Sequence, residues 1–186
     1  MRHKYGTSAI VLARAPLSED SALVTLLTTD LGLVRARAQG LRKPGAKLAA
    51  ALQTLSESEV ILVRGKDAWR LSGAVLSQNR FQAMPHGARL RAARVSGLIL
   101  RLVAGESADP ALYAVFSGFL EALASRPESE HDAAECLAAL RILRALGLDA
   151  GAEAPGAFGS AELAAISANR SSVVSRINRG LTASGL

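Results

Sequence analysis

The feature with the clearest chemical meaning is a cluster of cationic side chains with no acid among them. Five lysine and arginine residues stand between Asp30 and Glu57. In residues 1–80, twelve basic side chains stand against six acidic ones, so this part carries the whole net charge of +6 and residues 81–186 are neutral. Such segregation is typical of a surface that binds the phosphates of a polyanion. The cationic cluster consists of Arg35, Arg37, Arg42, Lys43 and Lys47.

Other cations of the first part could extend this phosphate track, although a solvated basic surface would have the same composition. Aromatic side chains for stacking bases are few here, namely Tyr5, Trp69 and Phe81. Trp69 could be a stacking platform, but a place in a core or hairpin is the more common use of a tryptophan. We therefore expect binding to the phosphate backbone of a nucleic acid, without sequence preference. The additional candidates for contacts with this backbone are Arg14, Arg64, Lys66 and Arg70.

Side chains for catalysis or metal binding are scarce. Cys136 is the only cysteine and the three histidines are scattered, so the chain cannot close a disulfide or a tetrahedral zinc site of its own. Residues 40–47 do not form a nucleotide-binding phosphate loop, because alanine follows the second glycine where lysine is needed. We expect no catalytic residue, no cofactor and no stoichiometric zinc.

The acidic residues leave one enzymatic alternative open. Glu19, Asp20 and Asp30 could hold magnesium for a nuclease. Paired acids at a turn more commonly form the turn itself. Loss of a labelled strand that depends on magnesium would support the nuclease.

The first part of the chain has the periodicity of strands. Val34, Ala36 and Ala38 alternate with Arg35 and Arg37, which predicts a half-buried strand with both arginines on its solvent face. Similar patterns predict strands over 7–15, 21–29, 57–64 and 69–78, and helix formers predict a short helix over 46–52. Five strands with a helix between the third and fourth are the layout of an OB-fold barrel, which could also serve an RNA-binding protein of translation.

After Phe81 the periodicity becomes helical. It predicts helices over 86–104, from Pro110 to about 125, and over 131–146, with one or two more in 160–186. We therefore expect an α+β protein with an N-terminal five-stranded OB-fold β-barrel in 1–80, basic and nucleic-acid-binding, and a C-terminal all-α helical domain in 85–186. No apolar stretch is long enough for a membrane span or signal peptide, which predicts a soluble, cytoplasmic protein.

Several short segments carry a resemblance to a known family. In order and spacing they resemble the N-terminal domain of RecO, the bacterial mediator of recombination, and residues 85–146 resemble its helical domain more loosely. The matching segments of the first domain are residues 9–12, 17–21, 24–28, 31–33, 38–42 and 51–54.

The resemblance implies a non-enzymatic factor of DNA repair. Such a factor binds single- and double-stranded DNA, anneals complementary strands, and works with RecR to load RecA onto strands coated with single-strand-binding protein. It would be cytoplasmic and nucleoid-associated. Many family members carry a cysteine quartet for zinc in the helical part, which Cys136 alone cannot supply.

One helical stripe has two interpretations. Arg91, Arg94 and Arg101 fall on one face of the helix over 86–104, opposite its apolar stripe. A solvated face is the simpler interpretation. The functional alternative is a binding site for the acidic tail of single-strand-binding protein, which the RecO resemblance implies.

Overall fold

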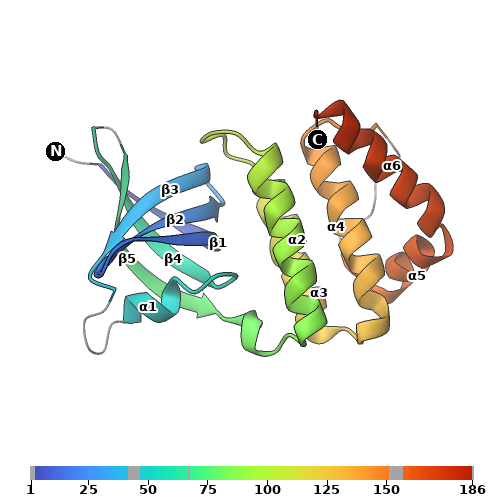
Figure 1. The fold of residues 1–186 in the computed structure, drawn as a ribbon, viewed down its shortest axis with the longest axis horizontal. Helices are drawn as coiled ribbons and strands as arrows, with labels where there is room; N and C mark the ends of the chain where they lie inside the picture. Colours follow the sequence, from blue (N-terminus) through green and yellow to red (C-terminus); the bar gives the residue numbers. More distant parts are fainter. Residues whose placement is uncertain (1–2, 42–46, 67, 151–156, 186) are drawn as a thin grey trace. The chain divides into compact units, whose positions relative to one another are not determined.

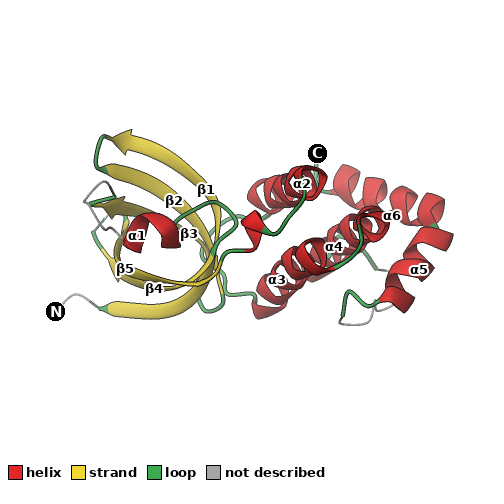
Figure 2. Ribbon diagram, turned by 90° about the horizontal axis from the view of Figure 1, so that it is seen from below, coloured by secondary structure: helices red, strands yellow, loops and turns green. Residues whose placement is uncertain are grey.

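Strands build the N-terminal part of the chain (Figure 1). The computed structural model describes residues 3–41, 47–66, 68–150 and 157–185. Within them, five strands form a closed barrel in the order β1-β2-β3-β5-β4, with β4 pairing back to β1 (Figure 2). All neighbouring pairs are antiparallel except β3 and β5. The strands are β1 (Lys4–Ser18), β2 (Ser21–Thr28), β3 (Gly32–Gln39), β4 (Glu57–Arg64) and β5 (Trp69–Gln78).

A short helix, α1 (Lys47–Ala51), lies between β3 and β4 in the sequence. Together with the strand order, it makes the barrel an OB-fold, so the predicted α+β class is confirmed. Alternation explains the core, since side chains two apart on a strand share one face. Val24, Val34, Ala36 and Leu62 are fully buried inside the barrel.

The long strand β1 differs from its prediction, because it continues through Pro16 to Ser18. Its first half, from Lys4 to Ile10, pairs with β4, and its second half pairs with β2. Proline lacks a backbone N–H and is tolerated where a strand has an unpaired side. Pro16 stands opposite Ala22 of β2, beyond the part of β1 that pairs with β4, so it does not end the strand.

The turn between β2 and β3 depends on Gly32. Its φ of 71° is in the left-handed region, which glycine adopts at little cost. A Cβ atom at this position would lie 2.1 Å from the backbone oxygen of Ser107. The hydroxyl of Thr28 closes the turn by donating to the Gly32 carbonyl at 2.8 Å and accepting from the Leu31 N–H at 3.0 Å.

We predict that Gly32→Ala destabilises the protein by at least about 2 kcal/mol, because the left-handed backbone and the contact with Ser107 both oppose a methyl group. Thermal unfolding measures the loss. Gly6→Ala is the matched control, since a Cβ atom there meets nothing within 4 Å. Equal melting temperatures for the two variants would contradict the strain at Gly32.

Helices build the second part of the chain. Asp109 caps α3 (Pro110–Ser125) by accepting the Leu112 N–H at 3.0 Å. Gly147, with φ of 72°, follows the end of α4 and allows the Leu148 N–H to reach the Leu143 carbonyl at 2.7 Å. The described helices are α2 (His86–Leu102), α3 (Pro110–Ser125), α4 (His131–Ala145), α5 (Ser160–Ala168) and α6 (Arg170–Ala183), with short 3-10 turns at Arg80–Gln82 and Glu128–Glu130.

The helix α4 is the centre of this part and packs against α2, α5 and α6. Cys136 is buried with Leu140 and Val173, as expected for a small core side chain. None of the described helices is long and apolar enough to cross a membrane.

Contacts along the chain group it into two units. One contains Met1–Gln82 with Ala104–Tyr113, and the other contains Ala83–Val103 with Ala114–Leu186. The segment between α2 and α3 is therefore grouped with the barrel. That residues 1–80 and 85–186 are two separate domains remains a prediction.

Candidate nucleic-acid interface

The strand β3 presents two arginines to solvent. Arg35 and Arg37 are exposed, while Val34, Ala36 and Ala38 between and beside them are buried. The two side chains therefore leave the strand on the outer face of the barrel, from Cα atoms about 7 Å apart. Neither forms an ion pair with any residue that the structure describes. Both are available to an anion from outside.

The parallel pairing of β3 with β5 adds a third cation to this face. Arg37 pairs with Arg70, and the preceding pair, Ala36 with Trp69, points into the barrel. Arg70 is exposed, and its Nη2 donates to Oε1 of Gln39 at 3.3 Å. Adjacent strands are about 4.8 Å apart, so Arg37 and Arg70 offer two neighbouring positive charges. We name Arg35, Arg37 and Arg70 the outer arginine group.

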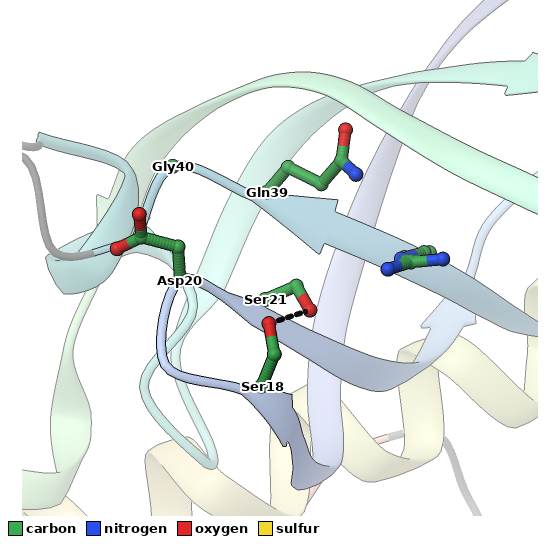
Figure 3. Close-up of a pocket in the computed structure, with 6 residues that line it drawn as sticks. Ser18, Asp20, Ser21, Gln39 and Gly40 are labelled. Carbon is green, nitrogen blue, oxygen red and sulfur yellow. Dashed lines mark hydrogen bonds between the residues drawn. The ribbon is translucent and has the colours of Figure 1, made fainter.

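A polar pocket of about 390 Å³ adjoins the outer arginine group. Figure 3 shows Ser18, at the end of β1, beside Ser21, at the start of β2, and their Oγ atoms are 2.7 Å apart. The Gly40 N–H donates to the Asp20 carbonyl at 2.9 Å and ties the end of β3 to the β1–β2 turn. The pocket is lined by Ser18, Asp20, Ser21, Arg37, Gln39 and Gly40.

Arg64 does not share this face. Its register partner is Trp69, which points into the barrel, and its guanidinium lies 4.8 Å from the centre of the Trp69 ring. Arg64 also forms an ion pair with Glu106, whose Oε1 accepts the Trp69 Nε1–H at 2.8 Å. Arg64 was predicted to extend the phosphate track, but its guanidinium already has an anionic partner, Glu106.

Trp69 is a core residue rather than an open platform. It is 5% exposed, and Tyr5 packs edge-on against its ring at 5.3 Å between centroids. The indole N–H and one ring face are used by Glu106 and Arg64. The sequence also favoured a core position for Trp69 over a role as a stacking platform.

The other predicted cations are not members of the outer arginine group, and some of them lie outside the described residues. Arg14 pairs with Val24, a core residue, and lines with Glu19 a pocket of about 280 Å³, which shares Ser18 and Ser21 with the pocket beside Arg37. Lys66 is exposed in the β4–β5 turn. Arg42 and Lys43 lie outside the described residues, as does the side chain of Lys47 at the start of α1.

The arginine stripe of α2 is largely tied to acids of α4. Arg91 contacts Asp132 at 3.3 Å and also Glu135, and Arg94 makes two bonds to Glu135 at 2.6 and 2.8 Å. Hydrogen bonds from Arg170, then from Arg91, hold the pKa of Asp132 below its ordinary value. Arg101 is exposed and has no ion pair among the described residues. Of this stripe, Arg101 is therefore the side chain most available to an acidic peptide.

The three carboxylates of the nuclease alternative are separated. Glu19 and Asp20 lie at one end of β2 and Asp30 at the other, about 20 Å away along an eight-residue strand. Asp30 accepts hydrogen bonds from the hydroxyls of Thr7 at 2.7 Å and Thr29 at 2.8 Å, which lower its pKa in that order. They cannot share one metal ion, and the described residues hold no trio of His, Cys, Asp or Glu placed to bind one.

The barrel places this chain in the OB-fold class, with exposed arginines on its outer face. Residues 1–80 match the family described as recombination protein O, N terminal. These 80 residues therefore belong to the N-terminal domain family of RecO. The name "DNA repair protein RecO" is also carried by the similar proteins found among curated sequences.

Three of these relatives show the extent of the similarity. The protein of Dehalococcoides mccartyi is 33% identical over 130 residues, covering 68% of this chain and 51% of the relative. For Synechococcus elongatus the values are 34% over 116 residues, with 62% and 44% covered. For Heliobacterium modesticaldum they are 32% over 143 residues, with 77% and 51% covered. The chain thus spans about half the length of the curated relatives it matches.

Proposed function

We propose that this chain is a DNA-binding mediator of recombinational repair. In this role it binds single- and double-stranded DNA through the backbone and anneals complementary strands. It works with RecR to help load RecA onto strands coated with single-strand-binding protein. The chain itself makes and breaks no bond, so the proposal includes no catalytic residue, metal or cofactor.

The outer arginine group is the observation that carries this proposal. Arg35, Arg37 and Arg70 are exposed on adjoining strands and lack ion pairs with the described residues. Cations in such a row suit phosphates, which repeat along any nucleic acid regardless of sequence. The buried Trp69 supports contacts with the backbone, because it leaves no open indole for stacking a base. The match of residues 1–80 to the N-terminal domain family of RecO supports DNA as the polyanion.

Salt dependence tests this mode of binding. If the five cations between Asp30 and Glu57 each meet a phosphate, the slope of log affinity against log salt on single strands is about −3 to −4. Fluorescence anisotropy with labelled strands of several sequences, and with duplex and RNA competitors, measures it. A slope near zero, or strong preference for one base sequence, would contradict the proposal. Preference for RNA over DNA would favour a role in translation.

We further propose that α2 contacts the acidic tail of single-strand-binding protein, as the family relationship suggests for Arg91, Arg94 and Arg101. Because Arg91 and Arg94 have acidic partners within the chain, Arg101 offers the cleanest test. We predict that Arg101→Glu slows annealing of coated strands about threefold and leaves annealing of naked strands unchanged.

The control for this prediction is Arg179→Glu, which reverses another exposed charge, on α6. Equal loss with coated and naked strands would assign Arg101 to the DNA surface. If neither assay shows a loss, Arg101 belongs to a solvated helix face.

A further inference from the structure

The outer face formed by β1, β4 and β5 has apolar side chains open to solvent. Ile61 of β4 is 45% exposed and Val75 of β5 is 70% exposed. The register partners of Ile61 are Gly6 on β1 and Gly73 on β5, so no bulky side chain flanks it on either neighbouring strand. A Cβ atom at Gly6 would meet nothing within 4 Å. We name Ile61 and Val75, with these two glycines, the apolar face.

A row of cations borders the apolar face on one side. Lys4 pairs with Val63, and Val63 pairs with Arg70, so these residues form the next outward row across β1, β4 and β5. Arg70 pairs in turn with Arg37 of β3. Lys4 is exposed and has no ion pair among the described residues. The row therefore continues the outer arginine group across the barrel to β1.

On the other side of Ile61, the carboxylate of Glu59 shares a row with Val75. Ser8, Glu59 and Val75 form the following outward row, and the hydroxyl of Ser8 donates to Glu59. The order across the face is thus a row of cations, then Ile61 between its two glycines, then a row in which Val75 of β5 stands beside Glu59 of β4. Phosphates are attracted to the first row and repelled by the third. A strand bound along the cations can therefore extend over Ile61 only with its uncharged parts.

We propose that the apolar face receives the unpaired bases of a single DNA strand whose phosphates lie along Arg37, Arg70 and Lys4. The inference rests on the proposed DNA binding and adds a base-contacting surface and the residue Lys4 to it. Unpaired bases expose apolar ring faces, whereas the bases of a duplex are stacked inside it. The apolar face would thus strengthen binding to single strands and leave binding to duplexes unaffected.

An abasic strand separates base contacts from backbone contacts, because it keeps the phosphates and lacks the bases. The experiment measures anisotropy with three labelled probes of equal length, namely oligo-dT, the abasic strand and a duplex. The test variant is Ile61→Thr with Val75→Thr, since threonine keeps the preference for strands and removes apolar surface. The control is Leu90→Gln, which removes an exposed apolar side chain from α2. Thermal unfolding checks that each variant is folded.

We expect the wild-type chain to bind oligo-dT about tenfold more tightly than the abasic strand, and the threonine variant to lose most of this preference. Affinities for the duplex and the abasic strand should change less than twofold. Lys4→Gln should reduce the salt slope on single strands by about 0.7, while Arg179→Gln should not change it.

Different failures have different meanings. Absence of binding to all probes by the wild-type chain would overturn the proposed function as well. Equal affinity of the wild-type chain for oligo-dT and the abasic strand would overturn only the apolar face as a base-binding surface. A threonine variant that keeps the full base preference would overturn it too, and a change of oligomeric state in that variant would assign the face to a second copy of the chain.

Discussion

We expect that reversing the charges of Arg35 and Arg37 together lowers the affinity for DNA about 100-fold at moderate salt, roughly tenfold for each side chain. Each glutamate removes a cation that can meet a phosphate and places a repelling carboxylate there. The loss should be similar for single strands, duplexes and different sequences, because phosphates are common to all. Anisotropy titrations of Arg35→Glu/Arg37→Glu at several salt concentrations measure it.

The barrel should stay folded in this variant. Both side chains lie on the outer face of β3 and form no ion pair with the described residues. A matched control is Arg101→Glu/Arg179→Glu, which makes the same change of net charge on two exposed helical positions. A comparable loss of affinity in the control would show that total charge, rather than the outer arginine group, governs binding.

Replacing Trp69 by alanine should destabilise the protein by about 3–5 kcal/mol, the usual cost of removing a large buried aromatic side chain. The indole is 5% exposed and contacts Tyr5, Arg64 and Glu106. Its loss leaves a cavity and deprives Glu106 of a hydrogen-bond donor. Chemical denaturation of Trp69→Ala, followed by circular dichroism, measures the change.

A second variant, Trp69→Phe, tests the role of Trp69 in binding. Trp69→Phe keeps most of the packing and loses the N–H, so it should be destabilised less than the alanine variant. Under conditions in which it remains folded, we expect its affinity for single strands to fall less than twofold. A loss of tenfold or more from a folded phenylalanine variant, without loss of stability, would identify Trp69 as a stacking platform.

Local periodicity was sufficient to predict most of the strands and helices. Alternation at Val34, Ala36 and Ala38 predicted a strand with Arg35 and Arg37 exposed, and the structure confirms this strand and both exposures. The cap at Asp109 and the end of α4 before Gly147 were also predictable, because they depend on neighbouring residues alone. These features need no knowledge of which strands pair.

The grouping of the cations depended on information that is not local. Arg70 meets Arg37 only through the parallel pairing of β3 with β5. Arg14 has the parity of an outward residue, but a register shift between Val11 and Ala13 turns it to the side of Val24. Alternation from Val60 and Leu62, both buried, could have placed Arg64 on the inner side of β4.

Acidic partners distant in sequence explain the remaining differences between the predicted and the observed surroundings of the cations. Glu106 contacts Arg64 and Trp69 from the segment between α2 and α3, and Glu135 contacts Arg91 and Arg94 from α4. Neither acid stands near its partners in the sequence. Lys4, which continues the row of cations on the barrel, was not predicted as a site residue, because the predicted strand began at residue 7 and β1 begins at Lys4.

The most direct test of the mediator role is annealing of two complementary strands that are both coated with single-strand-binding protein. Duplex formation is followed by fluorescence transfer between labels on the two strands, without added nucleotide. We predict that the wild-type chain accelerates annealing at least tenfold, and that Arg35→Glu/Arg37→Glu loses this effect. A chain that binds both strands tightly and leaves the rate of annealing unchanged would contradict the mediator role.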